Sequence, residues 1–246
     1  MGRRQLRVEL LQYTENPEQL VALAAKLCYS PSGMEELQRG VSQRDQAHFI
    51  SKLSGMGHLT PVEHASFTFG IEGVSRSLLA QITRHRIASF SVKSQRYVSE
   101  DSASNADGVF NYVIPPRIVA LGPGEVQEFE RQMAQIQQWY DQWLKKLAGY
   151  GDGAKEDARF VLPNAAETKL VVTMNARELL HFFSLRCCNR AQWEIRALAT
   201  EMLRQVRQVA PVLFRDAGPR CLKGPCPEGE MCCGRQAQVR EEFEKL

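Results

Sequence analysis

The chain has 246 residues, of which 43% are hydrophobic and 24% are charged, and its net charge is +3. These values are typical of a globular protein, and the small net charge excludes a chain that is basic throughout, such as a nucleic-acid coat protein. No apolar run approaches the roughly 20 residues that span a bilayer, and the N-terminus lacks the apolar core of a signal peptide. We therefore expect a cytoplasmic protein with no membrane partner.

The first half of the chain alternates between predicted strands and helices. A strand is expected over residues 5–12. Asn16 is then expected to cap a helix, with Pro17 at its first position and Gln19 as the capping-box partner. Apolar periodicity and turn residues predict three further elements: a helix over 42–56 that ends at Gly57, a strand over 65–71, and a helix over 76–84 capped by Ser75.

The second half contains the clearest amphipathic helix, over residues 124–149, whose stripe of Trp and Met side chains is typical of packing. The other predicted elements are a short strand over 109–114, a strand over 169–174, a helix that opens at the capping box of Asn175 and Glu178, and a helix over 191–210. The composition changes at residue 218. We therefore divide the chain into a domain of residues 1–217 and a cysteine-containing tail of residues 218–246.

Residues 83–97, which we call the basic stretch, read T-R-H-R-I-A-S-F-S-V-K-S-Q-R-Y and are rich in groups that bind anions. Arginine offers a planar fork of donors that fits phosphate, and the serines add short donors. Gln81 and Arg84 are three residues apart, so they share a helix face and can meet one ligand. We interpret the basic stretch as a loop around an anionic ligand, with a solvated basic turn as the structural alternative.

Other candidate site residues lie outside this stretch. His58 and His64 stand in a turn-rich segment before a predicted strand, where loops present functional groups, although a lone histidine is more often structural. Their spacing does not choose between them. Arg177 and His181 lie along one face of a predicted helix, and Arg159 stands beside an apolar run, where a plain surface role is the alternative.

Four blocks, in the same order, resemble the flavin-dependent thymidylate synthase family. They are G-H-x-T-P-x-E-H over 57–64, R-H-R-x7-S over 84–94, A-R-x-V-L-P over 158–163, and N-A-R-x-L with L-R and A-Q-W-E over 175–194. The resemblance covers about residues 20–209. It implies an α+β fold with a central, mostly antiparallel sheet flanked by long helices in a single domain, and a flavin site at the subunit interfaces of a homotetramer.

The same resemblance implies methylation of dUMP to dTMP. Methylenetetrahydrofolate would supply the carbon, and reduced FAD, regenerated by NADPH, would supply the hydride. The residues implied for FAD are His58, Thr60, Arg84, His85, Arg86, Asn175, Arg177 and His181. Those implied for dUMP are Gln81, Arg84, Ser94, Gln95, Arg96, Arg159 and Arg186. Arg186 is expected to stabilise charge that grows on the uracil ring, and Ser94 to help position the reacting carbon. No metal is implied.

The sequence departs from the family's pattern at two places. Ser91 and Val92 stand where many members have Asn and Glu, and Arg190 stands where a His is usual. The missing G-x-G-x-x-G unit agrees with the resemblance, because a Rossmann-type domain for flavin or NADPH is then not expected.

Two alternatives remain at the level of sequence. The basic stretch could be a phosphate track for nucleic acid, although the weak net charge and the lack of an aromatic stacking array disfavour it. The tail cysteines, Cys221, Cys226, Cys232 and Cys233, could bind zinc, but their spacing lacks paired C-x2-C units. With seven cysteines in an expected cytosolic chain, reduced thiols are favoured over both zinc ligation and disulfides.

Overall fold

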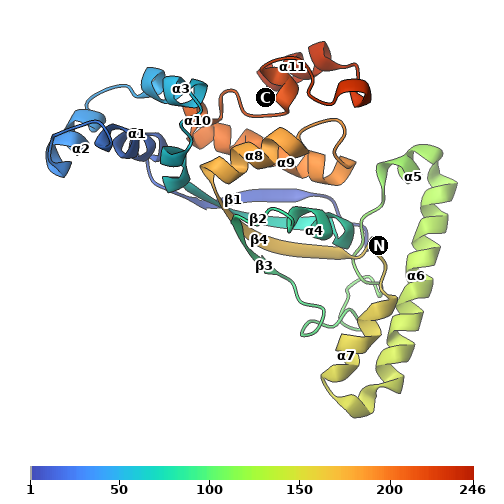
Figure 1. Cartoon of the computed structure of the whole chain (residues 1–246). Coiled ribbons are helices and arrows are strands. Elements are labelled where there is room, and N and C mark those ends of the chain that lie inside the picture. Colours follow the sequence, from blue (N-terminus) through green and yellow to red (C-terminus); the bar gives the residue numbers. More distant parts are fainter. Residues whose placement is uncertain (1) are drawn as a thin grey trace. The chain divides into compact units, whose positions relative to one another are not determined.

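The computed structural model describes residues 2–246 and contains both helices and strands (Figure 1). Its contacts divide the chain into two compact units. Unit 1 comprises the chain up to Arg7, Ile71–Arg84 and Phe90–Val171, and unit 2 comprises Val8–Gly70, His85–Ser89 and Val172–Leu246. Within residues 2–246, no helix combines the length and apolar character needed to cross a membrane.

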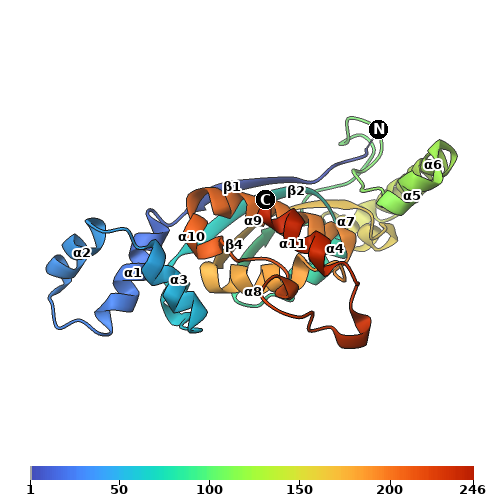
Figure 2. The same cartoon turned by 90° about the horizontal axis from the view of Figure 1, so that it is seen from above.

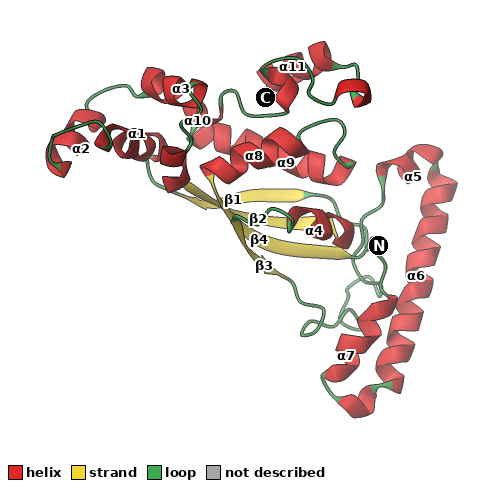
Figure 3. Ribbon diagram, viewed as in Figure 1, coloured by secondary structure: helices red, strands yellow, loops and turns green. Residues whose placement is uncertain are grey.

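The strands form one four-stranded sheet in the order β1-β2-β4-β3 (Figure 3). Their bounds are β1 (Arg7–Tyr13), β2 (Ser66–Ser75), β3 (Ala88–Val92) and β4 (Glu167–Asn175). β2 and β4 run antiparallel, since Thr68 bonds to Thr173 at one end and Gly73 to Glu167 at the other. β2 and β4 each contribute residues to both units. The predicted α+β class with a central antiparallel sheet is confirmed.

Unit 2 contains most of the helices. They are α1 (Pro17–Leu27), α2 (Met34–Ser42), α3 (Ala47–Gly55), α8 (Ala176–Arg186), α9 (Trp193–Val209), α10 (Pro211–Phe214) and α11 (Gln236–Glu244). α8 and α9 lie side by side over the strands of this unit (Figures 1 and 2). Leu198, Met202 and Val206 of α9 are fully buried, which confirms the amphipathic helix expected over 191–210.

Two predictions for the N-terminal region are wrong in detail. Asn16 stands before α1 in a left-handed conformation with φ of 46°, and its side chain makes no capping bond. Asparagine tolerates this conformation, and Pro17 still starts the helix because it has no N–H to satisfy. The single helix expected over 42–56 is instead the pair α2 and α3. The buried Gln46 amide donates to the carbonyls of Val41 and Arg44 and so stabilises the turn between them.

Unit 1 contains α4 (Arg76–Ile82), α5 (Pro116–Leu121), α6 (Pro123–Lys146) and α7 (Gly153–Ala158). The predicted cap of α4 is confirmed, since Ser75 Oγ accepts from the Leu78 amide at 3.1 Å. The predicted long helix is α6. Met133 and Tyr140 are buried as expected, but Trp143 is 44% exposed, so the apolar stripe is only partly used within this chain.

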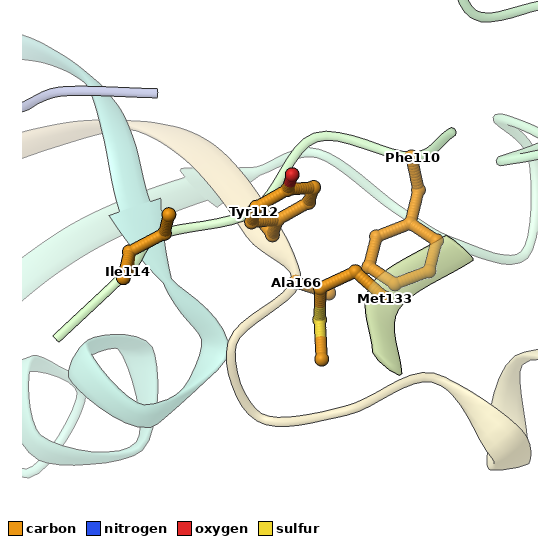
Figure 4. Packing of buried hydrophobic residues seen from close by; sticks show 5 residues of the cluster. All are labelled: Phe110, Tyr112, Ile114, Met133 and Ala166. Carbon is orange, nitrogen blue, oxygen red and sulfur yellow. The ribbon is translucent and has the colours of Figure 1, made fainter. Parts of the chain in front are cut away.

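A hydrophobic cluster packs between α6 and the segment before α5 (Figure 4). Its buried members are Phe110, Tyr112, Ile114, Met133 and Ala166. The strand expected over 109–114 is wrong, since only isolated bridges join Tyr112 to Arg3 and to Ala166. The buried Gln137 side chain accepts from the Phe110 amide at 2.7 Å. It thus replaces the backbone carbonyl that a neighbouring strand would offer to this amide.

The loop expected across the basic stretch is also wrong in its centre, where Ala88–Val92 forms the edge strand β3. In A-S-F-S-V, the apolar Ala88, Phe90 and Val92 alternate with two serines. Ser89 and Ser91 occupy the more exposed face. The Lys93 amide then donates to the Lys169 carbonyl at 2.9 Å, which ties the end of β3 to β4. The basic stretch is therefore two turns separated by a strand.

Gly73 is expected to be the glycine least tolerant of substitution in unit 1. Its φ is +70°, and an added Cβ would lie 1.8 Å from the Gln5 carbonyl oxygen. We expect Gly73→Ala to lower the free energy of unfolding by about 1–3 kcal/mol in urea denaturation. In the control Gly124→Ala, the new Cβ meets nothing within 4 Å, so stability should be kept or slightly raised. Equal stability of the two variants would contradict this reading.

Candidate functional site

The predicted site residues fall into two groups, one in each unit. Gln81, Arg84, Ser94, Gln95, Arg96 and Arg159 belong to unit 1. His58, Thr60, His85, Arg86, Asn175, Arg177, His181 and Arg186 belong to unit 2. The first group contains most of the residues expected for the nucleotide, and the second contains nearly all those expected for the flavin.

A cavity of about 520 Å³ in unit 2 brings together His58, Thr60 and Arg177. Its wall comes from α1, from the 3₁₀ turn Thr60–His64 and from the start of α8. His64 also lines this cavity, so both histidines of the turn-rich segment face one space. The Glu63 carboxylate pairs with the Arg177 guanidinium and fixes it beside the turn. The volume lies within the range of small-molecule sites.

The first turn of α8 is built by the predicted cap. Asn175 Oδ1 accepts from the Glu178 amide at 2.9 Å, which satisfies one of the N–H groups at the helix start. α8 then buries Leu179, Phe182 and Phe183 and leaves Arg177 and His181 exposed. The pattern of α8 therefore separates a packing face from a face that can meet a ligand.

His85 occupies the centre of a hydrogen-bonded network with the buried Glu178 on one side and the half-buried Arg186 on the other. Its Nδ1 lies 2.9 Å from Glu178 Oε1, and its Nε2 lies 3.1 Å from Nε of Arg186. A guanidinium can only donate, so Nε2 must accept and Nδ1 must carry the proton that Glu178 accepts. Burial lowers the pKa of His85, opposed by the hydrogen bond to Glu178. The ring is therefore held neutral, with both nitrogens engaged.

The R-H-R run thus divides by exposure. His85 is 5% exposed, whereas Arg84 and Arg86 on either side of it are exposed. Alternate residues of a turn point in different directions. Arg84 and Arg86 can therefore remain available to a ligand while His85 forms hydrogen bonds in the interior. The family resemblance implies all three as flavin-binding residues and does not distinguish them.

In unit 1, Arg96 and Arg159 meet the same residue of α7. Arg96 Nε pairs with the Glu156 carboxylate at 2.9 Å, and Arg159 Nε donates to the Glu156 carbonyl at 3.0 Å. These two arginines are 63 positions apart in sequence, yet Glu156 holds both. Glu156 therefore holds Arg96 through its carboxylate and Arg159 through its backbone carbonyl, and guanidinium groups of this kind can bind an anionic ligand.

Ser94 and Gln95 lie next to Arg96. Ser94 Oγ accepts from the Arg96 amide at 3.2 Å, which shapes the turn after β3. The Gln95 side chain is buried, and its Nε2 has no hydrogen-bond partner among the residues that the structure describes. A buried donor without a partner is costly, and a ligand acceptor would remove that cost. Gln81, at the end of α4, donates to the Ser77 carbonyl at 3.3 Å.

Several charged residues of these sites were not predicted. Arg76 is half-buried, and it donates to the Lys93 carbonyl at 3.0 Å. Burial lowers its pKa, and Arg159 contributes to the lowering. Lys93 pairs with the buried Glu100 carboxylate at 2.6 Å. The available signal for Arg76 was a cation in the first turn of a predicted helix, where the helix dipole favours anions.

The tail packs within unit 2 at the turn between α8 and α9. Arg190 donates to the Met231 carbonyl at 3.0 Å and faces the Glu228 carboxylate at 3.5 Å. A cavity of about 230 Å³ there is lined by Arg186, Cys188, Cys221, Cys226 and Cys233. In the described part of the chain, all seven cysteines are free thiols and no cluster of metal-ligating side chains occurs. Burial raises the pKa of the Cys187 thiol to about 12.

Known proteins resemble this chain over most of its length. The family described as thymidylate synthase complementing protein matches residues 9–212. A flavin-dependent thymidylate synthase of Geobacter sulfurreducens is 54% identical, with 98% of this chain and 99% of that protein aligned. One from Clostridium tetani is 47% identical, with 96% of each chain aligned. At 98% coverage, most of the cysteine-containing tail is shared with the Geobacter protein.

Solved structures agree with the fold. A UMP/dUMP methylase of Streptomyces cacaoi bound with 5-Br dUMP has a TM-score of 0.68 and 25% identity, covering 87% of this chain and 94% of that one. Thymidylate synthase X of Helicobacter pylori with FAD and dUMP has a TM-score of 0.61 and 24% identity, covering 87% and 99%. By its matched residues, its relatives and its fold, the chain belongs to the flavin-dependent thymidylate synthase family.

Proposed function

We propose that this chain is an FAD-dependent thymidylate synthase that methylates dUMP to dTMP. Methylenetetrahydrofolate is the carbon donor, and NADPH is the reductant of the flavin. The observation that carries the proposal is the contact of His85 with Arg186 at 3.1 Å. It joins the R-H-R segment to the N-A-R…L-R segment, and these are the two longest blocks by which the chain resembles the family.

The residues of the unit 2 cavity fit part of an anionic dinucleotide. Arg177 offers a guanidinium whose orientation Glu63 fixes, and His58, Thr60 and His64 add donors and acceptors. Arg84, Arg86, Asn175 and His181 complete the proposed flavin set. When bound, FAD supplies the reducing equivalents that convert the transferred carbon to a methyl group.

The nucleotide set in unit 1 fits a phosphate monoester. Arg96 and Arg159 provide two guanidinium groups around Glu156, and the partnerless Gln95 amide provides a further donor. A phosphate held there would fix the register of the uracil ring. Gln81, Arg84 and Ser94 belong to the same proposed set, with Ser94 positioned beside Arg96.

Arg186 carries the proposed catalytic role. The C5 carbon of uracil is a weak nucleophile, so the site must stabilise charge that grows on the ring during the reaction. A guanidinium stays charged at all relevant pH values and can do this without a proton transfer. A cysteine nucleophile is not part of the proposal. The Cys187 thiol, whose pKa is about 12, is almost entirely protonated at neutral pH.

The two departures from the family's pattern have different consequences. Val92 ends the edge strand β3 and cannot accept a hydrogen bond through its side chain, and the nearby carboxylate is the buried Glu100 bound to Lys93. Arg190, which replaces the usual histidine, contacts the tail through Met231 and Glu228. We propose that Arg190 anchors the tail and does not bind flavin.

The proposal extends to assembly and location. We propose a homotetramer with flavin sites between subunits, a cytoplasmic location, and a catalytic domain over residues 1–217 followed by the tail. The exposed Trp139 and Trp143 of α6 provide an apolar surface suited to a subunit contact. A nucleic-acid track is not favoured, because the histidine at the centre of the R-H-R run is buried.

The direct test is flavin content and product formation. The purified protein is expected to be yellow and to release FAD on denaturation. It should form dTMP from dUMP when methylenetetrahydrofolate and NADPH are supplied. A colourless protein that neither takes up FAD nor converts dUMP would overturn the proposed function.

Arg186→Ala is expected to abolish dTMP formation while the fold and much of the FAD binding remain, because the lost charge acts on the ring during the reaction. Product chromatography measures turnover, and flavin absorbance measures binding. The control Arg204→Ala, which removes a surface arginine paired with Glu201, should keep normal turnover. Near-normal turnover of Arg186→Ala would show that the assigned role is wrong.

Arg159→Ala is expected to weaken dUMP binding, because one charge-assisted phosphate contact is lost. Such a contact is worth about 1.5–3 kcal/mol, so the KM for dUMP should rise by about 10- to 150-fold. The control Lys155→Ala removes a neighbouring surface cation that pairs with Asp152 and should leave KM unchanged. If both variants shift KM equally, the effect is one of general charge and the assigned contact is refuted.

A further inference from the structure

The buried carboxylate of Glu178 has no role in the chemistry described so far. It lies in the first turn of α8 with 7% of its side chain exposed, and it contacts the His85 ring, which is 4% exposed. A buried carboxylate requires a partner, and Glu178 uses His85 for this purpose. The backbone N–H of Glu178 donates to the Asn175 cap, and this bond does not involve the Glu178 side chain, which contacts His85.

We infer that Glu178 is a positioning residue for Arg186 and that it acts through His85. Two hydrogen bonds link the three side chains. Nδ1–H of His85 donates to the Glu178 carboxylate, and Nε–H of Arg186 donates to Nε2 of His85. The inference deepens the proposed function and rests on it. It assigns His85 to the support of Arg186 and not to a hydrogen bond with flavin.

The direction of each hydrogen bond follows from the groups themselves. A carboxylate only accepts and a guanidinium only donates, so only the neutral Nδ1–H form of His85 satisfies both partners. If the carboxylate were lost, the ring could move its proton to Nε2. That proton would then face Nε–H of Arg186, and the contact would be lost. Glu178 therefore selects the one form of His85 that can hold Arg186.

Packing prevents the ring from rotating away. Phe182 meets the His85 ring edge-on with centroids 4.9 Å apart, and the His181 ring lies 6.0 Å away. The ionisable groups that act on His85 are Glu178, His181 and Arg186, all from α8. Arginine has many rotamers, so fixing its Nε sets the plane of the guanidinium before any ligand arrives.

Two substitutions of His85 test its hydrogen bond to Glu178 and its hydrogen bond to Arg186 separately. The amide of an asparagine side chain lies near the position of Nδ1, so His85→Asn keeps a donor for Glu178 but offers nothing to Arg186. The amide of a glutamine side chain reaches the position of Nε2, so His85→Gln can offer an oxygen to Arg186. Glu178→Gln removes the charge and leaves the shape.

Glu178→Gln and His85→Asn are each expected to lower kcat by about 10- to 100-fold, the range seen when supporting hydrogen-bond partners are removed. KM for dUMP and flavin content should change little, because the phosphate and flavin contacts remain. Combining the two changes should cost no more than one alone, since both break the same chain. His85→Gln should retain more turnover than His85→Asn.

The pH profile supplies a readout that a merely structural role would not change. Protonation of His85 places an N–H against Arg186, so kcat of the native protein should fall as the pH drops through the lowered pKa of His85, below its ordinary value of about 6.5. His85→Gln removes this titration and should flatten that limb. Nitrogen NMR of histidine should report a neutral Nδ1–H ring in the native protein and a mixture of the two tautomers in Glu178→Gln, because an amide can either accept from Nδ1–H or donate to Nδ1.

The outcomes separate this inference from the proposed function. Native protein and the control Glu201→Gln, which alters a surface pair on α9, must both form dTMP. If neither does, the proposed function fails, and the NMR tautomer still tests the contact. If both do, while Glu178→Gln keeps its kcat and pH profile or the combined variant loses turnover multiplicatively, the positioning role is overturned. Should Glu178→Gln fail to fold, His85→Asn, which leaves Glu178 a partner, decides the question.

Discussion

The hydrogen bonds of the His85 ring are the constraint on which the arrangement of unit 2 depends. The buried imidazole and carboxylate and the half-buried guanidinium satisfy one another only in one proton arrangement, and the imidazole and the carboxylate would each be costly to bury alone. α8 supplies two of the three groups, Glu178 near its start and Arg186 at its last residue. The Asn175 cap fixes the start of α8, and the buried face of the helix packs it in place, so Glu178 and Arg186 are both carried by an anchored helix.

In unit 1, a single glutamate, Glu156, positions two arginines of the proposed nucleotide site. Glu156 holds Arg96 through its carboxylate and Arg159 through its carbonyl, so one residue of α7 contacts both arginines. Both arginines are partly exposed, so their pairing contributes little to stability. The arrangement is better suited to exchange one carboxylate contact for phosphate contacts than to stabilise the fold. The side-chain Nε2 of Gln95, next to Arg96 in sequence, has no hydrogen-bond partner among the described residues, which also favours a ligand here.

The elements with strong local signals were predictable. β4, α8 and α9 follow apolar periodicity, and the caps at Ser75 and Asn175 follow from side-chain chemistry. β3 was missed because the charged residues on either side of it obscured its alternation. The 109–114 strand was overpredicted because its backbone pairs only through isolated bridges, and the Phe110 amide donates to the Gln137 side chain of α6 instead of to a strand. The resemblance named Arg96, Arg159 and Arg186. It could not reveal Glu156 or Glu178, because their roles arise from packing between segments distant in sequence.

We propose that the protein binds flavin through residues of unit 2 and the nucleotide phosphate through Arg96 and Arg159 of unit 1. A crystal structure of the protein with FAD and dUMP bound tests this most directly. We predict the phosphate within hydrogen-bond distance of both arginines and the Gln95 amide, flavin in the cavity of His58, Thr60 and Arg177, and Arg186 against the ring with its contact to His85 intact. A phosphate bound elsewhere, or an Arg186 turned away from the ring, would contradict the account.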